Sequence, residues 1–383
     1  MLSLRFLHKR YSTIFKVTHS MSQEQTIQYD QPLERYLQAK ATQPADLLQK
    51  DFPSGNSSYF QIYAATKKIF SEKYYNNIDI TANIGTPQGT VYTKHGIPHV
   101  AELIRHAGNI LGLGINDYNV SINGYESFLL LMAILVHDVG MFMDRDGHEG
   151  QCENIILTHR EALGLPVLEA KIIGEIAAAH TGRHPKTKKY LDTFSTLEQS
   201  PNHFGVIYRK RVLASIVRLA DELSENSERA HEFVAQNPKV NDDSKLRHAY
   251  CKSIANISPN PLTHIISVEY DLSVEAALTE YSIDGKSITL IEHIVNCLKK
   301  MEQERAYCTR YFAEVAYLST IEATFNIYAL GEYGIRNSIV TAPIKIGDTG
   351  YPRPRHNIAA LFKKITPNAI RQQYQQKTGK ELE

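Results

Sequence analysis

The sequence predicts a mainly α-helical fold with a small β element and further helices in its C-terminal part. Apolar residues recur at helical spacing over most of residues 30–235, and one of these segments is apolar on nearly every side. Alternating β-branched segments are confined to about residues 240–290. The chain has 383 residues, of which 43% are apolar, so it can bury a substantial core.

The first helices are expected within residues 30–75, where the breaker-rich stretch DFPSGNSS separates two helical patterns. Residues 77–94 are expected to be irregular. Five further helices are predicted, in the segments HGIPHVAELIRHAGNIL, GYESFLLLMAILVHDVG, HEGQCENIILTHREALG, LPVLEAKIIGEIAAAHTG and GVIYRKRVLASIVRLADELSEN. The second should be a buried central helix, because its longest apolar run is far shorter than the roughly 20 residues that a membrane span needs.

A change in pattern follows residue 235. THIISVEYDLS alternates like a strand, and YSIDGKSITLI predicts a hairpin that turns at Asp284-Gly285. A helical pattern returns across residues 289–330, and the tail from Thr341 holds eight Lys/Arg against three Asp/Glu and is expected to be partly disordered. We therefore expect four segments: a leader (1–28), a helical domain (29–235), an α/β appendage (236–340) and a basic tail (341–383).

Composition excludes several classes of protein. The net charge of +1 gives no field to attract nucleic acid or an anionic membrane. The four cysteines form no CxxC pair, which favours reduced thiols in an intracellular protein. No P-loop, GxSxG, HExxH or Rossmann glycine motif is present. A cytoplasmic location is expected, with an organellar one as the alternative if the basic residues 1–20 are a transit peptide.

Six polar residues stand in or at the ends of five consecutive predicted helices, where apolar residues belong. They are His99, His137, Asp138, His148, His180 and Asp221. A buried imidazole or carboxylate is costly unless it is paired or bound to a metal. Imidazole and carboxylate together suit Mn, Fe, Zn, Co or Ni. One shared metal site is therefore the interpretation that explains all six.

Taken singly, these residues have ordinary structural explanations. A histidine at a helix end can cap the helix, and Asp138 could be a solvated carboxylate at such an end. Asp221 could pair with Arg218, and His148 could be a plain residue at a helix start. It is their joint order along the chain that favours a site.

The order H…HD…D in this helical setting resembles the HD-domain superfamily of metal-dependent phosphohydrolases. The matching residues are His99 in HGIPHVAEL, His137-Asp138 in LVHDVGM and Asp221 in LADELS, and the likeness covers residues 90–230. It implies an HD-type helical bundle that holds one or two divalent ions (Mn, Fe, Co, Ni, Zn or Mg). It also implies phosphoester hydrolysis by metal-activated water, on a nucleotide or nucleoside phosphate. The region after residue 240 loosely resembles the appendage of large HD proteins from bacterial conflict systems.

A subset of the superfamily holds two ions, with one added histidine on each of two helices between the doublet and the last aspartate. His148 and His180 occupy those places, and Asp138 would bridge the ions. His95, one turn before His99, is expected either to orient a metal ligand without binding the metal itself or to cap the helix. His159 is expected at the surface. The chain lacks the paired histidines and the GYP motif of the cyclic-dinucleotide branch, which puts such substrates in doubt.

Phosphate chemistry also needs cations against the substrate. Candidates beside the ligands are Arg145, Arg183 and Lys186, so that Asp138, Arg145 and Arg183 are the predicted catalytic residues. Further along, Arg310 and Tyr311 could contact a base or sugar, but a chain with 22 tyrosines makes this signal weak.

Two other functions compete with hydrolysis of a small phosphorylated substrate. A small branch of the superfamily uses the same six ligands in a di-iron oxygenase, and metal identity would separate the two. A non-catalytic regulatory or binding module is disfavoured because the ligand set is intact. A membrane or nucleic-acid partner is not expected, and a homo-oligomer remains open.

Overall fold

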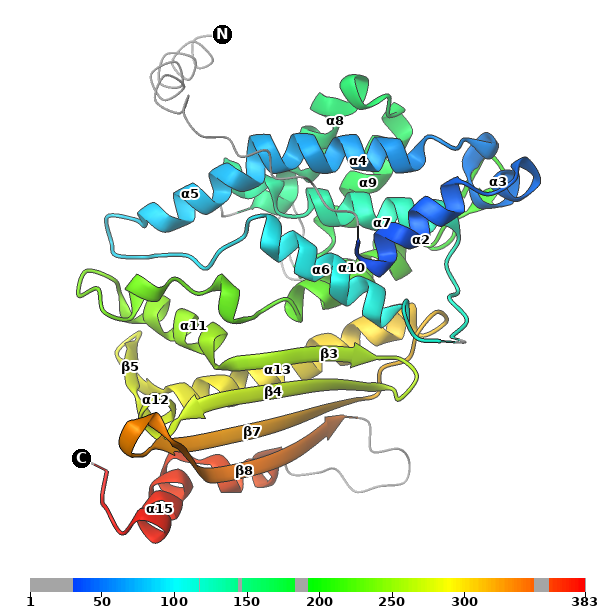
Figure 1. The fold of residues 1–383 in the computed structure, drawn as a ribbon. Helices are drawn as coiled ribbons and strands as arrows, with labels where there is room; N and C mark the ends of the chain where they lie inside the picture. Colours follow the sequence, from blue (N-terminus) through cyan, green and yellow to red (C-terminus); the bar gives the residue numbers. More distant parts are fainter. Residues whose placement is uncertain (1–29, 117, 144–146, 183–191, 348–357, 383) are drawn as a thin grey trace. The chain divides into compact units, whose positions relative to one another are not determined.

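The structure is a computed structural model that describes residues 30–116, 118–143, 147–182, 192–347 and 358–382. Contacts between Cα atoms join residues 31–383 into one unit. The leader expected at residues 1–28 lies outside the described residues. The mainly α-helical class with a β element is confirmed (Figure 1).

The N-terminal region forms helices, as expected, on both sides of the breaker-rich loop. They are α2 (Pro32–Ala41), α3 (Ala45–Asp51), α4 (Tyr59–Phe70) and α5 (Asn76–Ile84), with a π-turn, η2 (Ser71–Tyr75), between the last two. The expectation of irregular chain from residue 77 was therefore wrong as far as Ile84. Ile78 and Ala82 are both buried, and residues four apart share one face of a helix, so this short apolar face holds α5 against the protein.

Helix α7 (Gly124–Val136) is the predicted central helix. All thirteen residues are buried, and Asn123 begins the helix by accepting a hydrogen bond from the backbone N–H of Glu126 at 2.8 Å. Helices α2, α4, α9 and α10 pack around it. The stretch Gly124–Phe142 is long and apolar enough to cross a membrane by composition alone, but 89% of it lies buried inside the protein.

The other predicted helices also form. They are α6 (Ile97–Ile110), α8 (Cys152–Leu163), α9 (Val167–Ala178) and α10 (Lys210–Glu222). The last begins later than expected, because a short hairpin of β1 (Asn202–His203) and β2 (Val206–Ile207) precedes it. That hairpin turns through Phe204 and Gly205, which both have positive φ.

The C-terminal half contains α11 (Asp242–Ser253), α12 (Val274–Leu278), α13 (Leu290–Phe312) and a four-stranded sheet in the order β3-β4-β7-β8. The strands are β3 (Ile254–Asn260), β4 (Ile265–Ser273), β7 (Thr320–Leu330) and β8 (Arg336–Gly347). Only the β4–β7 pair is parallel, and the chain between them includes α13, which runs along the sheet (Figure 1). The predicted hairpin is also present as β5 (Glu280–Ile283) and β6 (Lys286–Thr289), with Asp284 and Gly285 at positive φ.

The sheet is larger than the sequence suggested. Residues 320–330 were expected to be helical, yet they form β7, whose side chains alternate between buried and half-buried along TIEATFNIYAL. The tail from Thr341 was expected to be partly disordered, yet residues 341–347 complete β8 and Pro367–Thr378 form α15. Alternating apolar residues of β8, among them Val340, Ala342 and Ile344, are buried and outweigh the basic composition. Residues 348–357 of that tail lie outside the described part.

Candidate metal centre

Five helical segments deliver the six predicted ligands to one place. His99 is in the first turn of α6, His137 and Asp138 directly follow α7, and Asp221 is the penultimate residue of α10. His148 begins the 3₁₀ turn η4 (His148–Gln151), and His180 lies two residues beyond α9. The site is thus built at helix ends, where the chain changes direction and side chains from separate helices converge.

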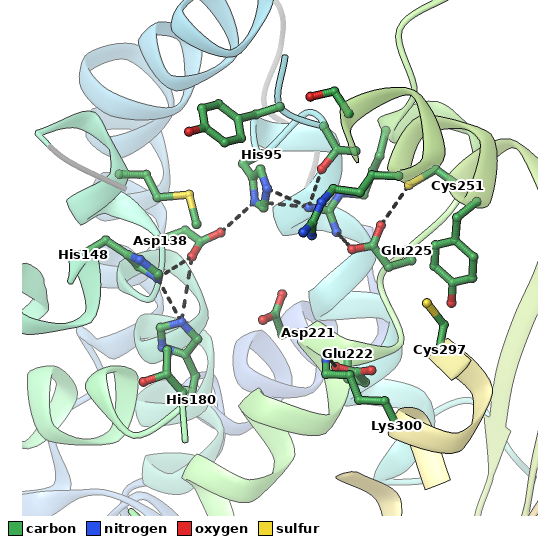
Figure 2. Close-up of a pocket in the computed structure, with 18 of the residues that line it drawn as sticks. His95, Asp138, His148, His180, Asp221, Glu222, Glu225, Cys251, Cys297 and Lys300 are labelled. Atoms are coloured by element: carbon green, nitrogen blue, oxygen red, sulfur yellow. Dashed lines mark hydrogen bonds and ion pairs between the residues drawn. The ribbon is translucent and has the colours of Figure 1, made fainter. Parts of the chain in front are cut away.

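The two oxygens of Asp138 face two groups of imidazoles. Oδ2 lies 3.3 Å from Nε2 of His137 and 3.7 Å from Nε2 of His99. Oδ1 lies 3.2 Å from Nε2 of His148 and 3.9 Å from Nε2 of His180. Figure 2 shows this carboxylate beside His148 and His180. A carboxylate in this position could ligate an ion held by either group.

Asp221 completes the first group. Its Oδ1 lies 3.3 Å from Nε2 of His99 and 3.9 Å from Nε2 of His137. Donor atoms of His99, His137 and Asp221 all lie within 4.8 Å of one another, and so do donor atoms of Asp138, His148 and His180. The described residues therefore offer two adjacent groups, each of a size that can hold one metal ion.

Backbone carbonyls fix the orientation of two of these rings. Nδ1 of His137 lies 2.8 Å from the carbonyl oxygen of Ile134, and Nδ1 of His180 lies 2.6 Å from that of Ala177. A carbonyl only accepts, so each Nδ1 carries a proton and Nε2 is the nitrogen that faces the carboxylate of Asp138. A metal-ligating histidine is typically oriented in this way by a partner of its other nitrogen.

The charges of the site suit a cation. Burial lowers the pKa of His180 to about 4 and also lowers the pKa of His99, so both imidazoles are neutral and free to ligate. Burial alone would raise the pKa of Asp138 and Asp221, but the adjacent imidazoles outweigh it and hold both pKa values below their usual range. Burial would lower the pKa of His137, but the charge of Asp138 raises it to about 9. Asp138 and Asp221 are therefore ionised, and their negative charge attracts a cation to the site.

Two buried nitrogens support the assignment of a metal. Nε2 of His99 and Nε2 of His137 have no hydrogen-bond partner of acceptable geometry among the described residues, although both rings are fully or nearly fully buried. A buried nitrogen without a hydrogen bond is costly, and coordination to a metal removes that cost. The residues present therefore fit one or two divalent ions.

Sequence comparison agrees with this geometry. The HD-CE family, an HD-type domain, matches residues 90–294, just over half of the chain. The chain belongs to the HD-CE family. No curated protein and no solved structure matches the chain. The HD-CE range includes all six candidate ligands and also extends past α10 through α11, β3 and β4.

The HD-CE centre opens into a cavity of about 1210 Å³. Asp138, His148, His180 and Asp221 line one end of it. Residues of α11 and α13 line the other: Tyr250, Cys251, His293, Cys297 and Lys300. The part of the chain beyond α10 therefore forms part of the wall that a bound molecule would touch.

The described cations of the cavity are already paired. Seven acidic and four basic side chains line it, and each basic side chain makes an ion pair. The pairs are Arg218–Glu304 at 2.7 Å, Arg229–Glu225 at 2.8 Å, Arg247–Asp243 at 2.9 Å and Lys300–Glu222 at 2.6 Å. Arg218 thus pairs with Glu304, and the alternative pairing with Asp221 is not seen.

Other candidates fall into three groups. Arg145, Arg183 and Lys186 lie outside the described residues, so their predicted roles stay predictions. Tyr311 donates a hydrogen bond to Asp192 and is not among the described residues that line the cavity. His159 lies on α8, where its Nε2 is 2.7 Å from the hydroxyl oxygen of Tyr74. It is also not among the described residues that line the cavity.

Sequence reasoning missed Arg229 and ranked His95 below the ligands. Arg229 is 4% exposed and lies beside His95, whose Nδ1 is 3.0 Å from Oδ2 of Asp138. The signal for His95 was its position one turn before His99. Arg229 stands in a polar stretch, SENSERAHE, which gave no periodic signal of burial.

Proposed function

We propose that this HD-CE protein is a two-metal phosphohydrolase that acts on a small phosphoester, with a nucleotide or nucleoside phosphate as the expected substrate. The proposal rests on the two carboxylate oxygens of Asp138, which face different histidines. Oδ2 faces His99 and His137, and Oδ1 faces His148 and His180. The first ion would take His99, His137, Asp138 and Asp221, and the second would take Asp138, His148 and His180.

Bound divalent ions would supply an acidified water as nucleophile and positive charge against the phosphoryl oxygens. The protein contributes the rest of the chemistry. Four of the proposed ligands are buried and exclude bulk water from one side of the centre: His99, His137, Asp138 and His180. The cavity is large enough for a nucleotide.

Charge supports an ion-dependent mode of substrate binding. The four described cations of the cavity are each neutralised by a carboxylate, so they offer little net attraction to a phosphate. The positive charge that a phosphate needs would come from the ions, together with Arg145 and Arg183. Removal of the metals should therefore abolish substrate binding as well as turnover.

Metal analysis of protein purified without chelator, followed by phosphate release from a panel of nucleotides, tests the proposal. We expect close to two ions per chain and release of phosphate in the presence of Mn²⁺, Co²⁺ or Ni²⁺. Asp138→Ala should lose both ions and all activity while its helical circular dichroism is unchanged. Two bound irons with oxygen uptake and no phosphate release would instead identify the di-iron oxygenase.

A further inference from the structure

Asp138 has one more imidazole neighbour than the six-ligand set explains. Nδ1 of His95 lies 3.0 Å from Oδ2 of Asp138, nearer than His137 at 3.3 Å or His99 at 3.7 Å. The His95 side chain is buried, and Figure 2 shows it on the opposite side of the carboxylate from His148. This contact needs an explanation, because the first ion already has four ligands without His95.

Arg229 decides which nitrogen of His95 carries the proton. Its Nη2 lies 2.9 Å from Nε2 and 3.2 Å from Nδ1 of His95. A guanidinium only donates, so the nearer nitrogen, Nε2, accepts. The proton then resides on Nδ1, which donates to Oδ2 of Asp138.

The same contacts argue against His95 as a metal ligand, although its donor atoms lie within 4.8 Å of those of His99 and Asp138. In this tautomer Nδ1 has no lone pair to give. Nε2 is occupied by Arg229, and an ion bound there would lie against a guanidinium that carries a full positive charge.

Arg229 is itself held firmly. Its Nε donates to the carbonyl oxygen of Lys94 at 3.0 Å, and its Nη1 donates to Glu225 at 2.8 Å. The other oxygen of Glu225 accepts from the thiol of Cys251 on α11 at 3.0 Å. A continuous series of hydrogen bonds, drawn in Figure 2, therefore joins α11 to Asp138.

We propose that His95, held by Arg229, is a positioning residue for the metal centre. Its hydrogen bond to Oδ2 sets the rotation of the Asp138 carboxylate, so that Oδ1 faces His148 and His180. The inference rests on the metal centre of the proposed function and not on its substrate.

Metal titration of the purified protein provides the test. His95→Ala should weaken binding of Mn²⁺ or Co²⁺ about 10–100-fold, the usual effect of losing a group that orients a ligand, and excess metal should restore two ions per chain. His95→Asn places an amide N–H where Nδ1 stood and should recover most of the affinity. Arg229→Gln should weaken binding like His95→Ala, and the double variant should be no worse than either single one.

If His95 were instead a metal ligand, the same variants should give the opposite results in the metal titration. Excess metal would then fail to restore the lost ion in His95→Ala, His95→Asn would not rescue it, and Arg229→Gln would tighten binding by removing a repelling charge. His106→Asn is the matched control, because His106 is a buried histidine of α6, the helix that His95 precedes, and it pairs with Glu102; this variant should keep wild-type metal binding.

If His95→Ala does not fold, His95→Asn and Arg229→Gln decide the question by themselves. A wild-type chain without metal would overturn the proposed function and this inference together. Two ions in the wild type with unchanged affinity in His95→Ala and Arg229→Gln would overturn this inference alone.

Discussion

Asp138 is 2% exposed, and five imidazoles lie within 4 Å of its oxygens. Taking a carboxylate out of water is costly, and a single imidazolium would offset that cost for one oxygen only. Two divalent ions would offset it for both oxygens. A metal centre that uses both side chains would thus explain why the apolar helix α7 is followed directly by His137 and Asp138.

His148 and His180 are the residues that separate a one-ion site from a two-ion site. We expect His148→Ala and His180→Ala each to lower bound metal from near two ions per chain to near one, with a large fall in turnover. The double variant should lose no further ion, because the second site is already empty. Elemental analysis after gel filtration measures this.

His159→Ala is the control for these variants, since that ring contacts Tyr74 outside the cavity. A wild-type content of one ion that stays at one in both variants would contradict the second site. The single-ion phosphohydrolase would survive that result.

His248 links stability to pH. Burial lowers its pKa from 6.5 to about 4, although the contact of its Nε2 with the carbonyl oxygen of Val91 acts in the opposite direction. Its Nδ1 accepts a hydrogen bond from the backbone N–H of His231 at 2.9 Å. The unfolded chain takes up a proton below about pH 6.5 and the folded chain does not, so this residue should make stability fall between pH 6.5 and pH 4.

Urea denaturation at pH 7.5, 6 and 4.5 measures this effect. His248→Gln should unfold more easily at pH 7.5 but show a smaller loss of stability toward pH 4.5 than the wild type. An equal loss in both proteins would show that other groups carry the acid sensitivity.

Two short turns place the second ligand group. The 3₁₀ turn η3 (Val139–Phe142) follows the His137-Asp138 doublet and packs against η4, which begins with His148. Gly140 makes this contact possible, because a Cβ at that position would lie 2.2 Å from the carbonyl oxygen of His148. The position of His148 is therefore set by backbone contact between the two turns.

Gly140→Ala should force these turns apart and cost about 1–3 kcal/mol of unfolding free energy, as overpacking does. It should also lower bound metal toward one ion per chain, since His148 moves away from Asp138. Chemical denaturation and elemental analysis measure the two effects.

Gly108→Ala is the matched control. Gly108 is buried in α6, and its added Cβ would meet its nearest neighbour at an ordinary 3.6 Å. Helix propensity favours alanine by up to about 1 kcal/mol, so this variant should be neutral or stabilised and keep its metal. Equal metal loss in both variants would remove the role assigned to η3.

At the scale of the whole molecule, the helical bundle does not form the cavity alone. Helices α11 and α13 line its far end, and α13 packs against α10, which carries Asp221. The sheet in turn supports these helices, with β7 at its centre between β4 and β8. The C-terminal strands therefore support the helices that line the cavity, although they contain none of the candidate ligands.

Truncation after Val340 should accordingly unfold the sheet, whereas removal of a disordered tail would leave it intact. The deletion removes the paired and buried residues Ala342, Ile344 and Ile346 together with α15. We expect a large loss of solubility or a clear fall in melting temperature, measured by differential scanning fluorimetry.

Truncation after Thr378, at the end of α15, is the control and should melt like the full chain. A protein truncated after Val340 that melts normally would contradict the structural role of β8.

From the sequence alone we could predict the helices of residues 97–222, the buried central helix and the six residues that converge. These features depend on local periodicity and on polar residues in apolar settings, which the chain displays directly. The hairpin at Asp284-Gly285 was also predictable, because a two-residue turn with positive φ has a local signature.

Other features were overlooked in the sequence or depended on contacts between distant segments. The alternation of apolar residues in TIEATFNIYAL is itself a local sign of a strand, which the helix expected across residues 289–330 overlooked. Its pairing with β4 and β8, by contrast, depends on tertiary contacts. The roles of Arg229 and of Asp138 likewise depend on which atoms of distant segments meet. Spacing can predict that six residues share a site, but the division of one carboxylate between two groups arises from packing of helix ends.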